Sequence, residues 1–371
     1  MAGSIEDERG FIMKHRKKSV LAVLMASAIM LSAGSGCGKT VVKEEASSLP
    51  VAVSSEAEPE PEGNLNPLTG FRDLDAAMVG KRPVSFMINN HHRSWPQRGI
   101  SQADIIYELP VEGGLTRLMA IFADYTKTPD FGSNRSVRHD FVELSLPFNT
   151  IFVHWGGSTF GYNALRQYGV NDIDGMAYGE KYFYTDRSLR KDIEHTRFMT
   201  QENLQDALKG IGYKLDGETP TAYQFAEEED SVSYTDSAKE IYVKVSNAVK
   251  TTFYYDDSAK DYTKREFDDD VIDGNTKEQV HIKNVFILYD NIPLMSDGLH
   301  VDLSLSSGEG WYITNGTRTA IKWSKGDAKN PMAYTTESGE TLTVNPGNSW
   351  VLFVPSNMKG NTTFDGGETT A

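Results

Sequence analysis

The sequence predicts an α+β fold of two domains: a mixed α/β-sandwich-like domain over residues 66–226 and a predominantly antiparallel β domain over 231–356. Strand and helix patterns alternate in the first region, and β-branched and aromatic runs between turn residues fill the second. The acidic run 227–230 separates the two regions. The chain has 371 residues, of which 39% are hydrophobic and 11% aromatic, so it can build a packed core and is not disordered throughout.

The N-terminus carries an export pattern. A basic cluster from Lys14 to Lys18 precedes an apolar run over 20–33 and small residues at 34–36, directly before Cys37. The apolar run has about 14 residues, fewer than the roughly 20 of a membrane-spanning helix. We therefore predict that residues 1–36 are a signal peptide and that Cys37 is lipidated. The pattern is similar to a bacterial lipobox, with Gly34 in place of the usual Leu. A plain signal peptide and an uncleaved anchor are the alternatives.

These features predict an extracytoplasmic lipoprotein held at the cell membrane by the lipid on Cys37. Residues 37–65 are rich in Pro, Ser and Glu, which predicts a flexible linker. Residues 357–371 are polar and rich in Gly and Thr, which predicts a disordered tail. Cys37 is the only cysteine, so an intrachain disulfide framework is excluded.

In the first domain, apolar and β-branched runs predict strands at 83–89, 104–109, 115–125 and 150–155. Helix patterns cover 136–146, 159–168 and 201–209, the last with Thr200 as its N-cap.

In the second domain, strands are predicted at 240–245, 252–255, 280–289 and 349–354. Asn315-Gly316 lies between two β-type runs within 311–323 and predicts a hairpin with a type I′ turn. The acidic segment 268–275 departs from the calcium-loop spacing of an EF-hand, and we expect a solvated turn around Asp273-Gly274.

The order of motifs from Asn66 to Pro355 resembles the YerB-like family of bacterial lipoproteins. The segments that carry the resemblance are NPLTGF at Asn66, RPVSFMINNH at Arg82, SQADIIYE at Ser101, VEGGLTRLMAIF at Val111, RSVRHDF at Arg135, HWGGS at His154, KNVFILY at Lys283, GEGWYITNG at Gly308 and NPGNSWVLFVP at Asn345. The resemblance implies a two-domain architecture, and it implies no catalytic residue.

One constellation is suited to binding an anion. A predicted strand ends at His154, two glycines follow, and a helix begins near Ser158, where free backbone N–H groups attract anions. Arginines at positions 135 and 138 share one face of the predicted helix upstream. The candidate site comprises Arg117, Arg135, Arg138, His139, His154, Gly156, Gly157 and Ser158. In the structural alternative, Ser158 only caps a helix and the arginines pair with Asp140, Glu143 or Glu108.

Other chemistries find less support in the sequence. Glu108 and Glu112 are candidate acids for glycoside hydrolysis, although acids at strand ends more often pair with arginine. The dispersed histidines form no metal-binding motif, and no phosphate-binding or dinucleotide loop is present, so we predict neither a metal nor a cofactor. Four aromatic residues of the second domain, Trp311, Tyr312, Trp323 and Trp350, either pack in the core or form a carbohydrate-binding face.

Three functions remain open. The first is a lipoprotein that binds an anionic or glycan ligand of the cell envelope, the second is a scaffold for an envelope protein, and the third is a cell-wall hydrolase using Glu108 and Glu112. A net charge of −15 makes nucleic acid an unsuitable partner, because nucleic-acid binding depends on neutralising phosphates. We rank binding above catalysis, because no nucleophile, metal set or cofactor loop stands out.

Overall fold

The computed structural model describes residues 62–188 and 192–367, which belong to one compact unit. The predicted signal peptide, Cys37 and nearly all of the predicted linker lie outside these residues. Within the described part of the chain, no helix is both long and apolar enough to cross a bilayer.

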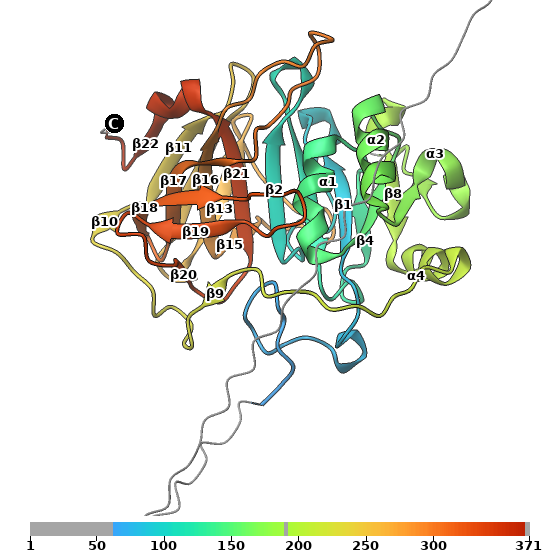
Figure 1. Cartoon of the computed structure of the whole chain (residues 1–371), viewed down its shortest axis with the longest axis horizontal. Coiled ribbons are helices and arrows are strands. Elements are labelled where there is room, and N and C mark those ends of the chain that lie inside the picture. Colours follow the sequence, from blue (N-terminus) through green and yellow to red (C-terminus); the bar gives the residue numbers. More distant parts are fainter. Residues whose placement is uncertain (1–61, 189–191, 368–371) are drawn as a thin grey trace, which may run out of the picture. The chain divides into compact units, whose positions relative to one another are not determined.

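Both predicted domains contribute to one large mixed sheet (Figure 1), whose strand order is β10-β18-β17-β16-β21-β2-β3-β1-β5-β6, with β19 paired to β18. The first domain supplies β1 (Val84–Asn89), β2 (Ile105–Pro110), β3 (Thr116–Phe122), β5 (Ile151–His154) and β6 (Asp172–Asp174). The second supplies β10 (Asp236–Ser237), β16 (Asn284–Asp290), β17 (Ser307–Thr314), β18 (Thr317–Ser324), β19 (Ala333–Thr336) and β21 (Ser349–Pro355). The α+β prediction is confirmed, and the domains meet where β2 pairs in parallel with β21.

Strand direction defines a polar edge of this sheet. Strands β1, β2, β5, β6, β16 and β21 all run the same way, whereas β3 and β17 run against them. The carboxyl ends of the six strands therefore lie along one edge, and we call it the carboxyl edge. In sheets with parallel strands, ligands bind at this kind of edge.

The second sheet has the order β14-β13-β12-β11-β22, with β15 paired to β13. Its strands are β11 (Glu240–Lys244), β12 (Lys250–Asp256), β13 (Asp261–Glu266), β14 (Asp269–Asp270), β15 (His281–Ile282) and β22 (Thr362–Phe364). Two smaller sheets contain β4 (Asp130–Gly132), β8 (Arg197–Thr200) and β7 (Tyr184–Thr185), and β9 (Gln224–Phe225) with β20 (Thr343–Val344).

The C-terminal tail is ordered further than the sequence predicted. Strand β22 pairs with β11 in the register Ile241↔Phe364, and a 3₁₀ helix over Ser356–Asn361 leads into it. Phe364 is buried, and its ring lies 5.2 Å from that of Trp311. The prediction of disorder across 357–371 is therefore wrong up to this strand, because the pairing of β22 with β11 and the burial of Phe364 anchor a polar segment.

The helices are α1 (His139–Ser145), α2 (Thr159–Tyr168), α3 (Gly175–Tyr178) and α4 (Gln201–Ile211). Six more 3₁₀ turns span Ala76–Met78, His92–Ser94, Glu112–Gly114, Leu146–Phe148, Gly179–Lys181 and Ile193–His195. The neighbouring helices α1 and α2 lie beside the first-domain strands in Figure 1. Thr200 caps α4 as predicted and accepts from the N–H of Asn203 at 3.1 Å. Ser158 caps α2, as the structural alternative held, and accepts from the N–H of Gly161 at 3.0 Å.

The predicted hairpin is formed by β17 and β18. Its turn is also as predicted, since Asn315 and Gly316 have positive φ angles of 49° and 71°. The strand expected over 280–289 is interrupted at Lys283 and becomes β15 and β16. Tyr312, Trp323 and Trp350 are buried and Trp311 is half-buried, so they pack in the core and form no carbohydrate-binding face.

The predicted solvated turn at Asp273-Gly274 is instead a contact between the domains. Asp273 is fully buried, and its carboxylate accepts hydrogen bonds from the backbone N–H of Ser101 at 2.8 Å and of Asn275 at 2.6 Å. A β-carbon on Gly274 would lie 3.0 Å from the carbonyl oxygen of Gln97, so the close approach favours glycine. Acidic composition alone did not reveal that this turn is buried.

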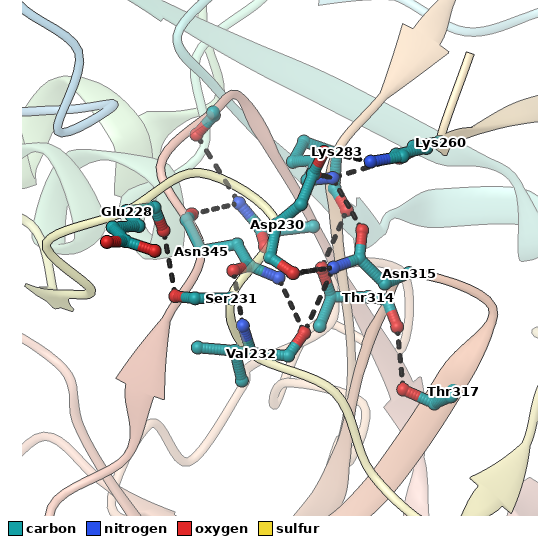
Figure 2. Close-up of polar contacts among 12 residues, drawn as sticks. Glu228, Asp230, Ser231, Val232, Lys260, Lys283, Thr314, Asn315, Thr317 and Asn345 are labelled. Atoms are coloured by element: carbon teal, nitrogen blue, oxygen red, sulfur yellow. Dashed lines mark hydrogen bonds and ion pairs between the residues drawn. The ribbon is translucent and has the colours of Figure 1, made fainter. Parts of the chain in front are cut away.

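The acidic segment between the domains is fastened to the second domain (Figure 2). The carboxylate of Asp230 pairs with the ammonium groups of Lys283 and Lys260. The side-chain amide of Asn315 donates to the carbonyl oxygens of Asp230 and Val232 at 3.0 and 3.1 Å, and Asn345 binds both backbone groups of Val232 at 2.9 Å. This boundary is therefore held in place by the hairpin turn and by the segment before β21.

Candidate functional site

Arg117 is the central cation of the carboxyl edge. It is the second residue of β3, lies opposite Asn89, the last residue of β1, and is 7% exposed. Its Nη1 donates to the carbonyl oxygen of Ser136 at 2.6 Å, and among the described residues no carboxylate lies within 4.0 Å of the guanidinium. Buried cations in proteins are ordinarily paired with an acid, so this one has the setting of a ligand-binding group.

Arg135 and Arg138 flank Arg117, although not on a helix face as predicted. The segment before α1 is extended: Arg135 N–H donates to the carbonyl oxygen of Met87 at 2.9 Å, and α1 begins only at His139. Arg138 donates from Nε and Nη2 to both oxygens of Glu112, and Arg135 contacts Glu194 at 3.1 Å. Their acid partners differ from the three acids that the structural alternative named.

The electrostatics of this cluster favour a bound anion. The pKa of Arg117 is lowered to about 9, first by burial and then by the positive charges of Arg138 and Arg135, with Glu112 opposing them. Three guanidinium groups therefore interact across a small region in which Glu112 is paired with Arg138 and Glu194 with Arg135. An added anion would relieve the desolvation of Arg117 and the repulsion among the cations.

The Gly-Gly-Ser turn has a structural role. His154 is fully buried, with Nδ1 2.8 Å from the carbonyl oxygen of Gly156 and Nε2 3.1 Å from Asp172. The backbone N–H of Gly156 donates to Asp174 at 2.8 Å, and a β-carbon on Gly157 would lie 2.7 Å from a methyl group of Val137. Because the protein itself uses these groups, His154, Gly156, Gly157 and Ser158 position the chain without forming the predicted anion site.

Glu108 is buried at the junction of the two sheets and does not face a cleft. Its Oε1 accepts hydrogen bonds from Thr116 at 2.8 Å and Asn90 at 3.3 Å, and its Oε2 accepts one from the indole N–H of Trp350 at 2.8 Å. Lys264 Nζ lies 3.2 Å from Glu108 and also contacts Glu266, and all three charged residues are at most 1% exposed. Sequence reasoning missed Lys264 and Glu266, which come from β13 of the other sheet.

The charged groups of this cluster shift one another's pKa. The pKa of Glu266 is raised to about 8, first by burial and then by repulsion from Glu108, with Lys264 opposing both. Burial alone would lower the pKa of Lys264, but the two carboxylates outweigh it and raise that pKa.

Glu112 lies apart from this cluster, in the turn after β2. Besides Arg138, it contacts His300 at 3.2 Å, and the arginine hydrogen bonds lower its pKa against the opposing effect of burial. Glu108 and Glu112 therefore do not line a common cleft, and the structure removes the acid pair that the hydrolase alternative needs.

An aromatic groove near the same edge escaped sequence reasoning. It has a volume of about 770 Å³ and is lined by His92, Arg93, Trp95, Pro96, Asp269, Asp270 and Ile272. The ring of Phe267 lies 5.6 Å from the rings of His92 and Trp95. The backbone of Phe267 has a φ of 55°, which is uncommon for a bulky residue. The two walls of the groove come from different domains, so no local sequence pattern could have predicted the groove.

Comparisons with known proteins agree with this architecture. Residues 68–214 match the model described as "Protein of unknown function (DUF3048) N-terminal domain", and residues 241–351 match the C-terminal domain of the same family. The chain is 29% identical over 293 residues to "Putative lipoprotein YerB" of Bacillus subtilis (strain 168), covering 78% of this chain and 86% of that protein. The crystal structure of YerB from Bacillus subtilis aligns with a TM-score of 0.69 and 27% identity, over 78% of this chain and 96% of that one.

Proposed function

Because the chain belongs to the two-domain family that includes YerB, we propose that it is an extracytoplasmic lipoprotein, anchored through Cys37, that binds an anionic polymer of the cell envelope. The leader pattern before Cys37 supports the anchor. The carboxyl edge supports the ligand class. The chain's negative net charge makes its own attraction to anionic lipids weak, so the lipid would supply the attachment.

One observation carries the ligand assignment: Arg117 is a buried guanidinium with no carboxylate within 4.0 Å in the described part of the chain, and two further arginines act on it. A guanidinium presents its N–H donors in a planar fork that matches the oxygens of phosphate or carboxylate. A phosphate-bearing or carboxylate-bearing polymer would therefore supply the missing negative charge. Arg135, whose side chain is 29% exposed, is placed to assist from the solvent side.

The aromatic groove suggests that the polymer also contains sugar. His92 and Trp95 follow β1 closely, and Arg117 pairs with the last residue of that strand. Aromatic rings accept the apolar faces of sugar rings, and the carboxylates of Asp269 and Asp270 are acceptors for hydroxyl groups. An anionic glycan would use both sets of contacts.

We expect Arg117→Met to weaken binding of phosphate-bearing cell-wall glycan fragments by about 10- to 100-fold, because a charge-assisted hydrogen bond contributes roughly 1.5–3 kcal/mol. The same variant should keep or raise the protein's stability, since it removes a buried charge that has no acid partner. The measurements are titration calorimetry and thermal unfolding of the full-length protein in detergent. Trp95→Ala should weaken binding of the glycan fragments and leave the affinity for inorganic phosphate unchanged.

Arg166→Ala is the matched control, because Arg166 is an exposed arginine on α2, and we expect it to bind as the wild type does. Equal affinity for dephosphorylated fragments would refute the anionic part of the proposal. A strong loss of stability in Arg117→Met would show that Arg117 is a structural residue. If no envelope polymer binds, the scaffold function is the better account.

The anchor has its own test. Replacing Cys37 with Ser removes the only thiol that can carry the lipid, so the protein should move from the membrane fraction to the soluble extracytoplasmic fraction. Mass spectrometry of the wild type should find an acyl chain on a new N-terminus at this cysteine. A wild-type protein with an intact leader and no lipid would contradict the proposal.

A further inference from the structure

Three potential metal ligands meet where the start of α1 touches the 291–306 segment of the second domain. His139 Nε2 lies 2.9 Å from Asp302 Oδ1 and 3.2 Å from Asp140 Oδ1. One ligand atom from each residue lies within 4.8 Å of the others. His139 and Asp302 are 163 residues apart in the sequence, which is why no spacing motif predicted this group.

The distances fit a coordination shell. With metal–ligand bonds of about 2.0–2.2 Å, two neighbouring ligand atoms lie about 3.0 Å apart at right angles and about 3.4 Å apart in a tetrahedron. The two separations from His139 Nε2, 2.9 and 3.2 Å, fall in or close to this range. The third separation, between the ligand atoms of Asp140 and Asp302, is at most 4.8 Å, so the three atoms lie around one position.

The surroundings of Asp140 hold an excess of negative charge. Asp140 is 3% exposed. The charged groups that act on it are the imidazole of His139 and the carboxylates of Asp302 and Glu143. Together with Asp140 these make three carboxylates around a single histidine, and a divalent cation would balance their charge.

The side chains are also held in place. Asp140 Oδ1 accepts from the backbone N–H of Leu303 at 3.2 Å, so the two segments that supply the ligands are joined directly. The ring of Phe160 lies 6.2 Å from that of His139 and 5.5 Å from that of His300. Of the two ring nitrogens of His139, Nε2 contacts the two aspartates, and Nδ1 is buried with no hydrogen-bond partner among the described residues.

We infer that His139, Asp140 and Asp302 bind one first-row divalent metal ion, Zn²⁺ or Mn²⁺, with water completing its coordination. One imidazole nitrogen with two carboxylates suits these ions, whereas Ca²⁺ and Mg²⁺ prefer oxygen ligands throughout. The ion would fasten the 291–306 segment to α1 and so connect the two domains close to Arg138. This inference is independent of the anion proposal, because it uses none of the three arginines.

The test is titration calorimetry of the full-length, chelator-treated protein with Zn²⁺, Mn²⁺, Mg²⁺ and Ca²⁺. We expect one saturable site for Zn²⁺ or Mn²⁺, binding at least tenfold tighter than Mg²⁺ and Ca²⁺. His139→Ala and Asp302→Asn should each weaken it at least tenfold and abolish the rise in melting temperature that the ion produces. Asp302 is a good site for substitution because its side chain is 52% exposed, and the metal-free melting temperature checks the fold.

His281→Ala is the matched control. His281 Nδ1 lies 2.8 Å from Asp261 Oδ1, so it forms a similar pair, but outside the three-residue group. Its replacement should leave metal binding unchanged. The inference is overturned if neither ion shows saturable binding, if both site variants bind as the wild type does, or if the control loses affinity to the same extent.

Discussion

Lys264→Met should destabilise the protein by about 3–5 kcal/mol, the usual cost of removing one partner from a buried ion pair. Lys264 is the only cation within 4.0 Å of Glu108 and Glu266 among the described residues, and all three are almost inaccessible to solvent. Without the ammonium group, the carboxyl group of Glu108 remains buried beside that of Glu266 with no cation within 4.0 Å among the described residues. Chemical unfolding at neutral pH, with tryptophan fluorescence as the signal, measures the loss.

Two further variants make this prediction specific. Lys250→Met replaces an exposed lysine on the adjacent strand β12, and we expect a change within about 0.5 kcal/mol. Adding Glu266→Gln to Lys264→Met should recover part of the lost stability above pH 8, where Glu266 would otherwise become a second buried carboxylate without a cation. If Lys264→Met has the same free energy of unfolding as the wild type, the buried ion pair does not contribute to stability and the prediction is wrong.

Glu266→Gln should change how stability depends on pH. Burial raises the pKa of Glu266 in the folded protein to about 8, against an ordinary 4.5, so the folded state keeps a proton that the unfolded state releases. Its contribution to stability is complete below pH 4.5 and is lost as pH rises toward 8, by up to about 1.4 kcal/mol per pH unit. The variant lacks this proton, and its stability should fall less steeply over that range.

The measurement is the free energy of unfolding of both proteins between pH 5.5 and 8.5. The free energy of unfolding of the wild type minus that of the variant should decrease as pH rises and become constant above pH 8. Burial raises the pKa of Asp104 and of Asp140 to about 7, but these carboxylates are present in both proteins and their effects cancel in the comparison. Parallel curves would contradict the prediction.

What the sequence predicted correctly depends on local rules. The bounds of α2 follow from its Ser cap and the glycine after its last turn, and the Asn315-Gly316 hairpin follows from two residues that tolerate positive φ. The predictions of β1, β2 and β21 are also local, because a run of apolar residues indicates a buried strand whichever neighbour it pairs with.

What the sequence could not predict depends on pairing across the chain. The segment before α1 follows a helical pattern, but it is held extended by backbone contacts with β1 and with Gly156. Likewise, the sequence made Glu108 a candidate acid at the end of a strand. In the structure, Lys264 and Trp350 from distant strands contact it, and it is buried. The arginine cluster was predicted in part: Arg117, Arg135 and Arg138 do gather, while the Gly-Gly-Ser turn is used by the protein itself.

The parallel pairing of β2 with β21 has a consequence for how the protein can be divided. Cutting between the two domains would remove the backbone hydrogen-bond partners of a central strand on each side, leaving two long apolar edges open. Each half alone would then offer a template for self-association. The two halves are therefore not interchangeable modules, and a truncation that follows the family boundaries would yield fragments prone to aggregate.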